Sequence, residues 1–359
     1  MNKKSKTMDE KTFKVWATGC AHVNADKKMG RDSLGEAITD SEKFFNWDIG
    51  INIGDFSAAI GLPTDEEGKE VVNQFKYLKK HKREDIYTIC GNHDRNSPQQ
   101  PEGMWFQKWL DPIGENSKFS DVKKENYTFP VNGTFENYFF DVGNIRFLMM
   151  SDINQKNQIK GRGELGGHPT GVVSKNTFDW WVSQIEENHK NKILVSAHHY
   201  MLKETTVASG DWEGMKKDEN GNWQTNYHGY FSEGTPISAS YLSWVGNEYG
   251  KNNFENWLID NPGKLDIWMG GHTHTNPDDS FGGKSHIERK YGGTLFINVS
   301  ALTRWHVKRH AIPMSRLFTF KDKSETASVE CFLHSDDYLK KGFYQEKKLD
   351  FQLSKKFEF

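Results

Sequence analysis

Five short apolar segments of the chain each run directly into a cluster of glycine and polar residues. An apolar run of this length that ends at glycine is typical of a buried strand. Amphipathic helical segments separate the first three, which predicts a β-α-β-α-β order and therefore parallel pairing. The chain is thus limited to an α/β fold in which polar side chains gather at the carboxyl ends of neighbouring strands. The five segments are residues 13–19, 47–55, 86–94, 191–199 and 265–274.

Two regions between these strands show no regular period and are predicted to be insertions. Residues 98–130 contain one short helical segment, and residues 201–251 are expected to lie over the site. A helix is predicted over 65–81, and Ser33 and Ser174 are each placed to cap another. We expect one domain over residues 13–335, between a flexible tail at 1–12 and a charged tail at 336–359.

The composition narrows the classes of function. The chain has 47 Lys and Arg against 49 Asp and Glu, a net charge of −2, which disfavours nucleic acid as a partner. It has no apolar run near the roughly 20 residues that cross a bilayer, and its N-terminus lacks the apolar region of a secretory signal. Its three widely spaced cysteines do not indicate a disulfide framework. We therefore expect a soluble, cytoplasmic protein.

The polar clusters at the ends of the five strands combine imidazole, carboxylate and carboxamide groups. This ligand set is typical of Zn, Mn or Fe sites rather than of Ca or Mg sites. The glycines beside these groups let the backbone turn sharply and approach an ion closely. The clusters are Cys20-Ala21-His22, Gly54-Asp55, Gly91-Asn92-His93-Asp94, His198-His199 and Gly270-Gly271-His272-Thr273-His274.

The five clusters, taken in this order, resemble the signature of the calcineurin-like metallophosphoesterase family. The Gly-Asn-His-Asp and Gly-His-Thr-His motifs are the most specific, and the resemblance extends over residues 13–299. It implies an α/β fold that is a four-layer αββα sandwich of two mixed β-sheets, with two metal ions (Zn, Fe or Mn) at the rim of the sheets. The implied ligands are His22, Asp55 and His274 for one ion, and Asp55 as a bridge with Asn92, His198 and His272 for the other.

The resemblance also implies two catalytic residues. His93 would lie near the substrate, and Asp94 would orient its imidazole. Of the two histidines at the end of segment 191–199, His198 is chosen as the metal ligand because it directly follows the apolar run. His199 would then face the substrate or support a ligand.

Cys20 departs from the family pattern, which has Asp at this position. A thiolate also binds metal and, being soft, favours Zn or Fe over Mn or Mg. Our hypothesis is that Cys20 is a terminal ligand of the first metal ion. The alternatives are a weakened first site, one that fills only when substrate binds, or a small buried side chain without a metal.

The function implied is hydrolysis of a phosphoester by two metal ions. Two cations roughly 3.5–4 Å apart bind a phosphoryl group and lower the pKa of the water between them, which then attacks as a bridging hydroxide. The expected substrate is a small phosphorylated metabolite or nucleotide, cleaved by a phosphatase or phosphodiesterase reaction. Two alternatives stay open: a nuclease with the same site, and a degenerate, non-catalytic scaffold that binds protein. No protein partner is indicated.

Overall fold

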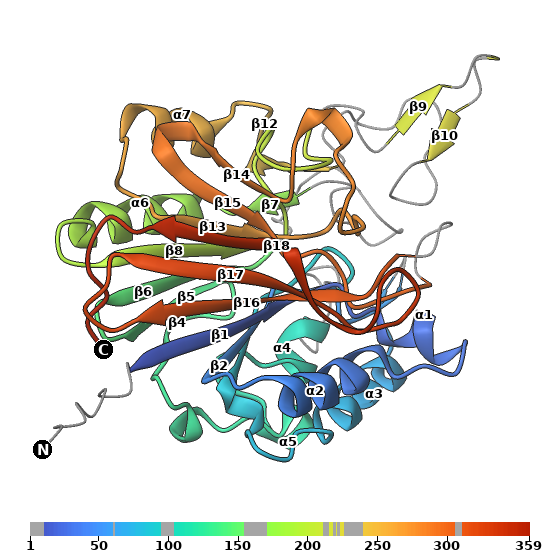
Figure 1. The fold of residues 1–359 in the computed structure, drawn as a ribbon. Helices are drawn as coiled ribbons and strands as arrows, with labels where there is room; N and C mark the ends of the chain where they lie inside the picture. The colour runs from blue at the N-terminus through green and yellow to red at the C-terminus, as the bar shows by residue number, and fades with distance from the viewer. Residues whose placement is uncertain are drawn as a thin grey trace, which may run out of the picture.

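The computed structural model describes most of the chain: residues 11–59, 62–94, 104–153, 171–210, 215–217, 220, 223–225, 240–305 and 311–359. Two large β-sheets pack face to face, and helices cover the outer face of each (Figure 1). The predicted four-layer αββα sandwich of two mixed sheets is therefore confirmed.

The first sheet has the strand order β18-β17-β16-β1-β2-β3. Strands β1, β2 and β3 are parallel, as their separation by helices predicts, and β16, β17 and β18 extend the sheet in antiparallel fashion. The bounds are β1 (Thr12–Thr18), β2 (Ile49–Asn52), β3 (Ile86–Thr88), β16 (Met314–Lys321), β17 (Thr326–Leu333) and β18 (Gly342–Gln352).

The second sheet has the order β14-β15-β13-β8-β6-β5-β4. Its four central strands are parallel, and antiparallel strands form both edges. Val142 pairs with Ile145, so Gly143 and Asn144 form a two-residue turn. The bounds are β4 (Asn132–Gly133), β5 (Asn137–Val142), β6 (Ile145–Met150), β8 (Ile193–His198), β13 (Ile267–Gly270), β14 (Ile287–Lys290) and β15 (Thr294–Asn298).

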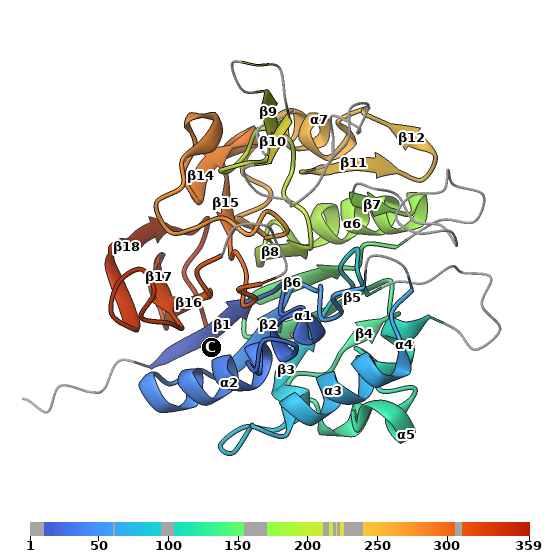
Figure 2. The ribbon, with the colours of Figure 1, turned by 90° about the vertical axis from the view of Figure 1, so that its right-hand side faces the viewer.

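Seven α-helices make up the outer layers of the described chain. Figure 2 shows α1 to α5 beside the first sheet and α6 and α7 beside the second. They are α1 (Val23–Lys27), α2 (Ser33–Phe44), α3 (Asp65–Phe75), α4 (Trp105–Trp109), α5 (Ser117–Ser120), α6 (Lys175–Asn188) and α7 (Asn253–Asp260). Short 3-10 turns cover Arg83–Asp85, Lys124–Asn126, Phe281–Gly283 and Tyr291–Gly293.

Three apolar clusters separate these four layers. The largest lies between the sheets and contains Val15, Ile51 and Val195. A second packs α2, α3 and α4 on the first sheet, and a third packs α6 and α7 on the second. Because successive side chains of a strand point to opposite faces, each central strand contributes to the inter-sheet cluster and to one outer cluster.

The observed caps and ends of the helices agree only in part with those predicted from the sequence. The Ser174 side chain accepts a hydrogen bond from the Thr177 N–H, which is the predicted cap of α6. Ser33 instead begins α2 and donates its hydroxyl to the Ala21 carbonyl at 2.6 Å. Helix α3 ends at Phe75, six residues before the predicted end at 81, so the lysine-rich segment that follows is not α-helical.

The two expected insertions hold further elements. Helices α4 and α5 lie within residues 98–130, of which 98–103 are outside the described residues. Residues 201–251 include a β9–β10 hairpin (Met215–Lys217, Trp223–Thr225), and β11 (Leu242–Val245) and β12 (Glu248–Tyr249). Strand β11 pairs with β7 (Gly171–Val173) in a small third sheet. Most of residues 211–239 lie outside the described chain.

The expectation of a charged C-terminal tail at 336–359 is wrong. Strand β18 pairs along β17, and the Phe357 side chain is buried between the two large sheets. The end of the chain is also held by the Asn144 N–H, which donates to the Glu358 carbonyl at 3.0 Å. The segment resembles a tail because β18 is an edge strand, whose many charged side chains face solvent.

No helix in the described part of the chain is long and apolar enough to cross a membrane. At the N-terminus, strand β1 begins at Thr12, which lies inside the expected flexible tail at 1–12. Residues 1–10 lie outside the described range.

Candidate metal centre

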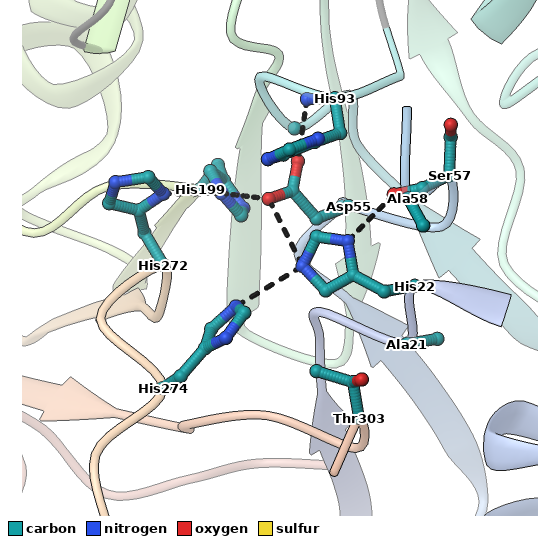
Figure 3. A network of polar contacts seen from close by, with 12 residues as sticks. Ala21, His22, Asp55, Ser57, Ala58, His93, His199, His272, His274 and Thr303 are labelled. Carbon is teal, nitrogen blue, oxygen red and sulfur yellow. Dashed lines mark hydrogen bonds and ion pairs between the residues drawn. The ribbon is translucent and has the colours of Figure 1, made fainter. Parts of the chain in front are cut away.

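The strand-end motifs of the two sheets meet at one rim of the sandwich. His22 and Asp55 follow β1 and β2 of the first sheet, whereas His199 follows β8 and His272 and His274 follow β13 of the second. Figure 3 shows these five side chains pointing toward one another, with the Asp55 carboxylate among the imidazoles. The expected convergence of segments far apart in sequence is therefore present.

Four side chains form the first group that could hold an ion. The candidate ligand atoms of Cys20, His22, Asp55 and His274 all lie within 4.8 Å of one another, and all four residues are buried. The Nε2 atoms of His22 and His274 are 3.2 Å apart, and the His22 Nε2 is 3.6 Å from the Asp55 Oδ2. Facing nitrogen atoms at this distance need a proton or a cation between them.

A second group shares Asp55 with the first. It consists of Asp55, His199 and His272. The His199 Nε2 lies 3.1 Å from the Asp55 Oδ2 and 3.1 Å from the His272 Nδ1. The same carboxylate oxygen therefore faces an imidazole of each group, which is the arrangement that a bridging ligand between two ions requires.

Backbone carbonyls fix the orientation of three imidazoles at this rim. The Nδ1 atoms of His22, His199 and His93 lie 2.7 Å, 2.8 Å and 2.5 Å from the carbonyl oxygens of residues 57, 53 and 59, respectively. A carbonyl only accepts, so each neutral ring carries its proton on Nδ1 and keeps the lone pair on Nε2. Metal-binding histidines commonly use this arrangement, because the carbonyl sets both the tautomer and the ring direction.

The electrostatics of the centre favour an ionised Asp55. Burial opposes its ionisation, but the nearby imidazoles of His199 and His93 hold the pKa of Asp55 well below its usual range. Burial likewise opposes a charge on His199, yet Asp55 raises the pKa of that imidazole above its ordinary value. The carboxylate thus carries a negative charge, which the nearby imidazoles and the His93 backbone N–H stabilise.

The backbone at the centre is strained at each candidate ligand of the two groups except His199. The φ angles are +49° at Cys20, +40° at His22, +61° at Asp55, +70° at His272 and +45° at His274. Left-handed φ values in residues other than glycine cost on the order of 1 kcal/mol or more each, and they persist only where surrounding contacts enforce them. Such clusters of strain are typical of functional sites.

Two glycines allow the loops of the centre to approach one another. A Cβ atom on Gly91 would lie 2.2 Å from the Asp55 Oδ1, and one on Gly54 would lie 2.3 Å from the Gly91 backbone nitrogen. Gly54 also has a φ of +95°, which L-residues rarely adopt. The Gly-Asp and Gly-Asn-His-Asp motifs therefore need glycine to bring Asp55 against the loop that carries Asn92 and His93.

The structure brings His199, not His198, to the other candidate ligands. Along β8, Val195 and Ala197 face the core between the sheets, so His198 points outward to Trp268 and His199 points inward. The His198 Nδ1 accepts the Tyr200 N–H at 3.0 Å. The choice of His198 is corrected because the two-residue period of the strand directs it away from the metal groups.

The hydrogen bonds found for the Asp94 carboxylate in the described chain come from backbone N–H groups and not from the His93 ring, so its predicted orienting role is corrected. Its Oδ2 accepts the N–H groups of Asp55 at 2.7 Å and Gly91 at 3.0 Å. Its Oδ1 accepts the N–H groups of residues 56 and 57 at 2.7 Å and 2.9 Å. Burial and the Asp55 charge raise the pKa of Asp94, while N–H donors of residues 57 and 91 lower it. Asp94 therefore ties the Asp55 loop to the His93 loop.

Asn92 and Cys20 are both buried at the centre. Asn92 is 3% exposed, and neither its Oδ1 nor its Nδ2 finds a hydrogen-bond partner within the described chain. A buried carboxamide without hydrogen bonds is unfavourable, and a cation beside Asn92 would satisfy its Oδ1, which is the atom that can act as a ligand. Cys20 is fully buried, and burial together with the Asp55 charge raises the pKa of its thiol; a bound cation would act in the opposite direction. Both residues therefore fit a metal centre.

His93 completes the rim of the centre. Its N–H donates to the Asp55 Oδ1 at 2.8 Å, and its ring meets the His22 ring edge to face with centroids 4.9 Å apart. Its Nδ1 lies 2.5 Å from the carbonyl oxygen of residue 59, and its ring stands beside the Asp55 carboxylate (Figure 3).

Together, the αββα sandwich and the shared carboxylate at its rim define a fold and a site of the metallophosphoesterase class. A sequence profile described as calcineurin-like phosphoesterase matches residues 13–276. The chain belongs to this family.

Comparison with other proteins adds distant likenesses only. A search of curated proteins finds no match. Among solved structures, Vacuolar Protein Sorting 29 from Cryptosporidium parvum is 12% identical, covers 95% of this chain and 98% of its own, and has a TM-score of 0.36. The Vps29 double mutant from Entamoeba histolytica is 11% identical, with coverage of 95% and 100% and a TM-score of 0.36. Vps29 from Chaetomium thermophilum is 8% identical, with coverage of 95% and 99% and a TM-score of 0.31.

Proposed function

We propose that this protein hydrolyses a small phosphoester with the help of two metal ions, Zn, Fe or Mn. The residues proposed to hold the first ion are Cys20, His22, Asp55 and His274, and those for the second are Asp55, Asn92, His199 and His272. The observation that carries the proposal is the Asp55 Oδ2, which lies 3.6 Å from the His22 Nε2 and 3.1 Å from the His199 Nε2. One carboxylate oxygen between two sets of imidazoles supports a pair of ions rather than a single one.

The ions have two tasks in the proposed chemistry. When bound, two cations offset the charge of a phosphoryl group and make a water nucleophilic at neutral pH. Each remaining task falls to side chains of this chain: Asp55 spaces the two ligand groups, and the carbonyls of residues 53 and 57 keep His199 and His22 in the metal-binding tautomer.

His93 is proposed as the group that touches the substrate. Its Nδ1 proton is donated to the carbonyl of residue 59. In this proposal the ring Nε2 faces the substrate, and it donates a hydrogen bond or a proton when it is protonated. It would stabilise a phosphate oxygen or protonate the departing alcohol, which typically contributes on the order of 10²–10⁴-fold to the rate.

The proposal is tested by metal analysis combined with hydrolysis assays. Purified protein is analysed for bound elements and then incubated with bis(p-nitrophenyl) phosphate and with p-nitrophenyl phosphate, with added Zn, Fe or Mn. We expect close to two metal ions per chain and a metal-dependent preference for one ester class. Asp55→Asn should lose metal and activity together, whereas His189→Ala, on the half-buried end of α6, serves as a matched control that keeps both.

The other outcomes separate the alternatives. A protein that binds no metal and cleaves neither ester would refute the hydrolase and leave a non-catalytic scaffold. Hydrolysis of DNA or RNA, with an affinity that falls steeply as salt rises, would favour a nuclease. Cys20, Cys90 and Cys331 are all buried and form no disulfide in the structure, which supports the proposal that the protein works in the reducing cytoplasm.

A further inference from the structure

A second pocket lies between the edge strands of the two large sheets. It has a volume of about 440 Å³, within the range of small-molecule sites. Strands β14 and β18 are the outermost strands of their sheets and lie on the same side of the molecule (Figure 2). Residues from both line this pocket, and so does Arg316 of β16. None of its lining residues belongs to the metal centre.

Arg316, on the wall of this pocket, is a buried arginine whose hydrogen-bonding groups are only partly satisfied. It is 1% exposed, and its Nε donates to the Asn298 carbonyl at 3.2 Å. Its Nη1 is buried and has no hydrogen-bond partner among the described residues. Because Phe318, two positions along β16, packs between the sheets, Arg316 also points into the space between them. A buried guanidinium without a counter-charge is unfavourable unless a partner is supplied from outside the chain.

The other basic residues of the wall already have carboxylate partners. Lys284 pairs with Glu204 at 2.6 Å, Lys347 with Asp278 at 2.6 Å, and Lys348 with Glu330 at 3.6 Å. Arg316 has no such ion pair within the described chain. The unmatched positive charge of the pocket is therefore localised at a single guanidinium.

The acidic residues of the wall limit the charge of a ligand. Four acidic residues, Asp278, Asp279, Glu288 and Glu346, line the pocket beside the four basic ones, so the wall has no surplus of positive charge for a polyphosphate. Burial and the charges of Arg316 and Lys347 lower the pKa of His286, which keeps that neighbour neutral. A ligand with one negative group suits these surroundings, and a carboxylate matches the two-pronged geometry of guanidinium.

We propose that the pocket between β14 and β18 binds the carboxylate group of a small organic acid through Arg316. Ile287 and Leu349 on the wall give the remainder of the acid an apolar surface. The site is linked to the metal centre by hydrogen bonds through Asn298, whose Nδ2 donates to the Thr273 hydroxyl at 3.0 Å, between His272 and His274.

The test uses 4-bromobenzoate as probe, with 4-bromobenzamide as an uncharged probe of the same shape. Calorimetry on the metal-loaded protein should show binding of the acid with a Kd below about 1 mM and at least about tenfold weaker binding of the amide. Anomalous scattering from bromine in a soaked crystal should place the acid beside Arg316.

Variants then assign the binding to one side chain. Arg316→Met should weaken binding of the acid at least about tenfold, while Arg289→Met, a matched change on β14 outside the pocket lining, should leave it unchanged. Equal binding of acid and amide, or bromine seen only at the metal ions, would overturn the proposal. Those two measurements use the unmodified protein, so they decide the matter even if Arg316→Met does not fold.

Discussion

Replacing Asp94 by Asn tests whether this residue holds the metal-binding loops together. Each Asp94 carboxylate oxygen accepts two backbone N–H groups, three from residues 55–57 and one from Gly91. The amide of Asn keeps one acceptor oxygen and replaces the other by a donor. Two N–H groups would then face an NH₂ group in a site that is fully buried, where water cannot replace the lost bonds.

The expected loss of stability is large. Because burial and the Asp55 charge raise the pKa of Asp94 to about 7, the comparison is made above that pH, where the carboxyl is ionised. A hydrogen bond to a charged group contributes about 1.5–3 kcal/mol, so the loss of two predicts a fall of about 3–6 kcal/mol in the free energy of unfolding. Domains are commonly stable by only about 5–15 kcal/mol. Because the released loop carries Asp55, metal content should fall as well.

Urea denaturation of wild-type and Asp94→Asn protein, each with excess Zn and with a chelator, measures both effects. The alternative reading, in which Asp94 only orients the His93 ring, predicts slower turnover with unchanged stability and metal content. If Asp94→Asn lies within about 0.5 kcal/mol of wild type, the normal range of surface changes, and still binds its metals, the loop-tethering account is refuted.

Four further predictions concern single side chains. His199→Ala should lose one metal ion per chain by elemental analysis, and His198→Ala should not; the reverse pattern would restore the sequence-based choice. Cys20→Ser should shift the metal preference from Zn toward Mn in competition assays, because a soft ligand is lost; an unchanged preference excludes a thiolate ligand. His93→Ala should keep its metals yet lose at least about 10²-fold in turnover of an unactivated ester, and wild-type rates would contradict that role. Burial raises the pKa of Glu255 to about 7, so the contribution of the protonated side chain to stability is present below about pH 4.5 and lost as pH rises through 7. Relative to Glu255→Gln, wild type should lose on the order of 3 kcal/mol in the free energy of unfolding between pH 4.5 and 8, measured by urea denaturation. Parallel plots of stability against pH for the two proteins would refute this.

The fold class, and the gathering of most candidate ligands at one rim, could be predicted from the sequence. Apolar runs of strand length, separated by amphipathic helices, predict the parallel strands β1, β2 and β3. Because polar residues at the carboxyl ends of such strands converge, Asp55 and His272 could be assigned to one rim before any coordinates. These features depend on local periodicity and on general rules of chain connection.

The features that could not be predicted depend on contacts across the fold. A strand's period of two separates His198 from His199 but does not say which face meets the other sheet. Val195 and Ala197 shared the parity of His199, which would have been a signal had the inter-sheet face been known. Three of the four Asp94 partners lie 37–39 positions earlier in the chain, and all four are backbone groups, so no residue type marks them. Strand β18 was missed because the solvent side of an edge strand has the composition of a tail.

The distribution of the ligands over the two sheets has a mechanical consequence. His22 and His274 are 252 positions apart and come from opposite sheets. A cation held by both would therefore cross-link the two sheets. Ions of this kind bind only the assembled chain and add their binding free energy to its stability. Removal of the metal by a chelator should therefore weaken the contact between the two sheets at this rim first. Refolding after the metal is restored should be slow, because contacts between segments so far apart in sequence must form again.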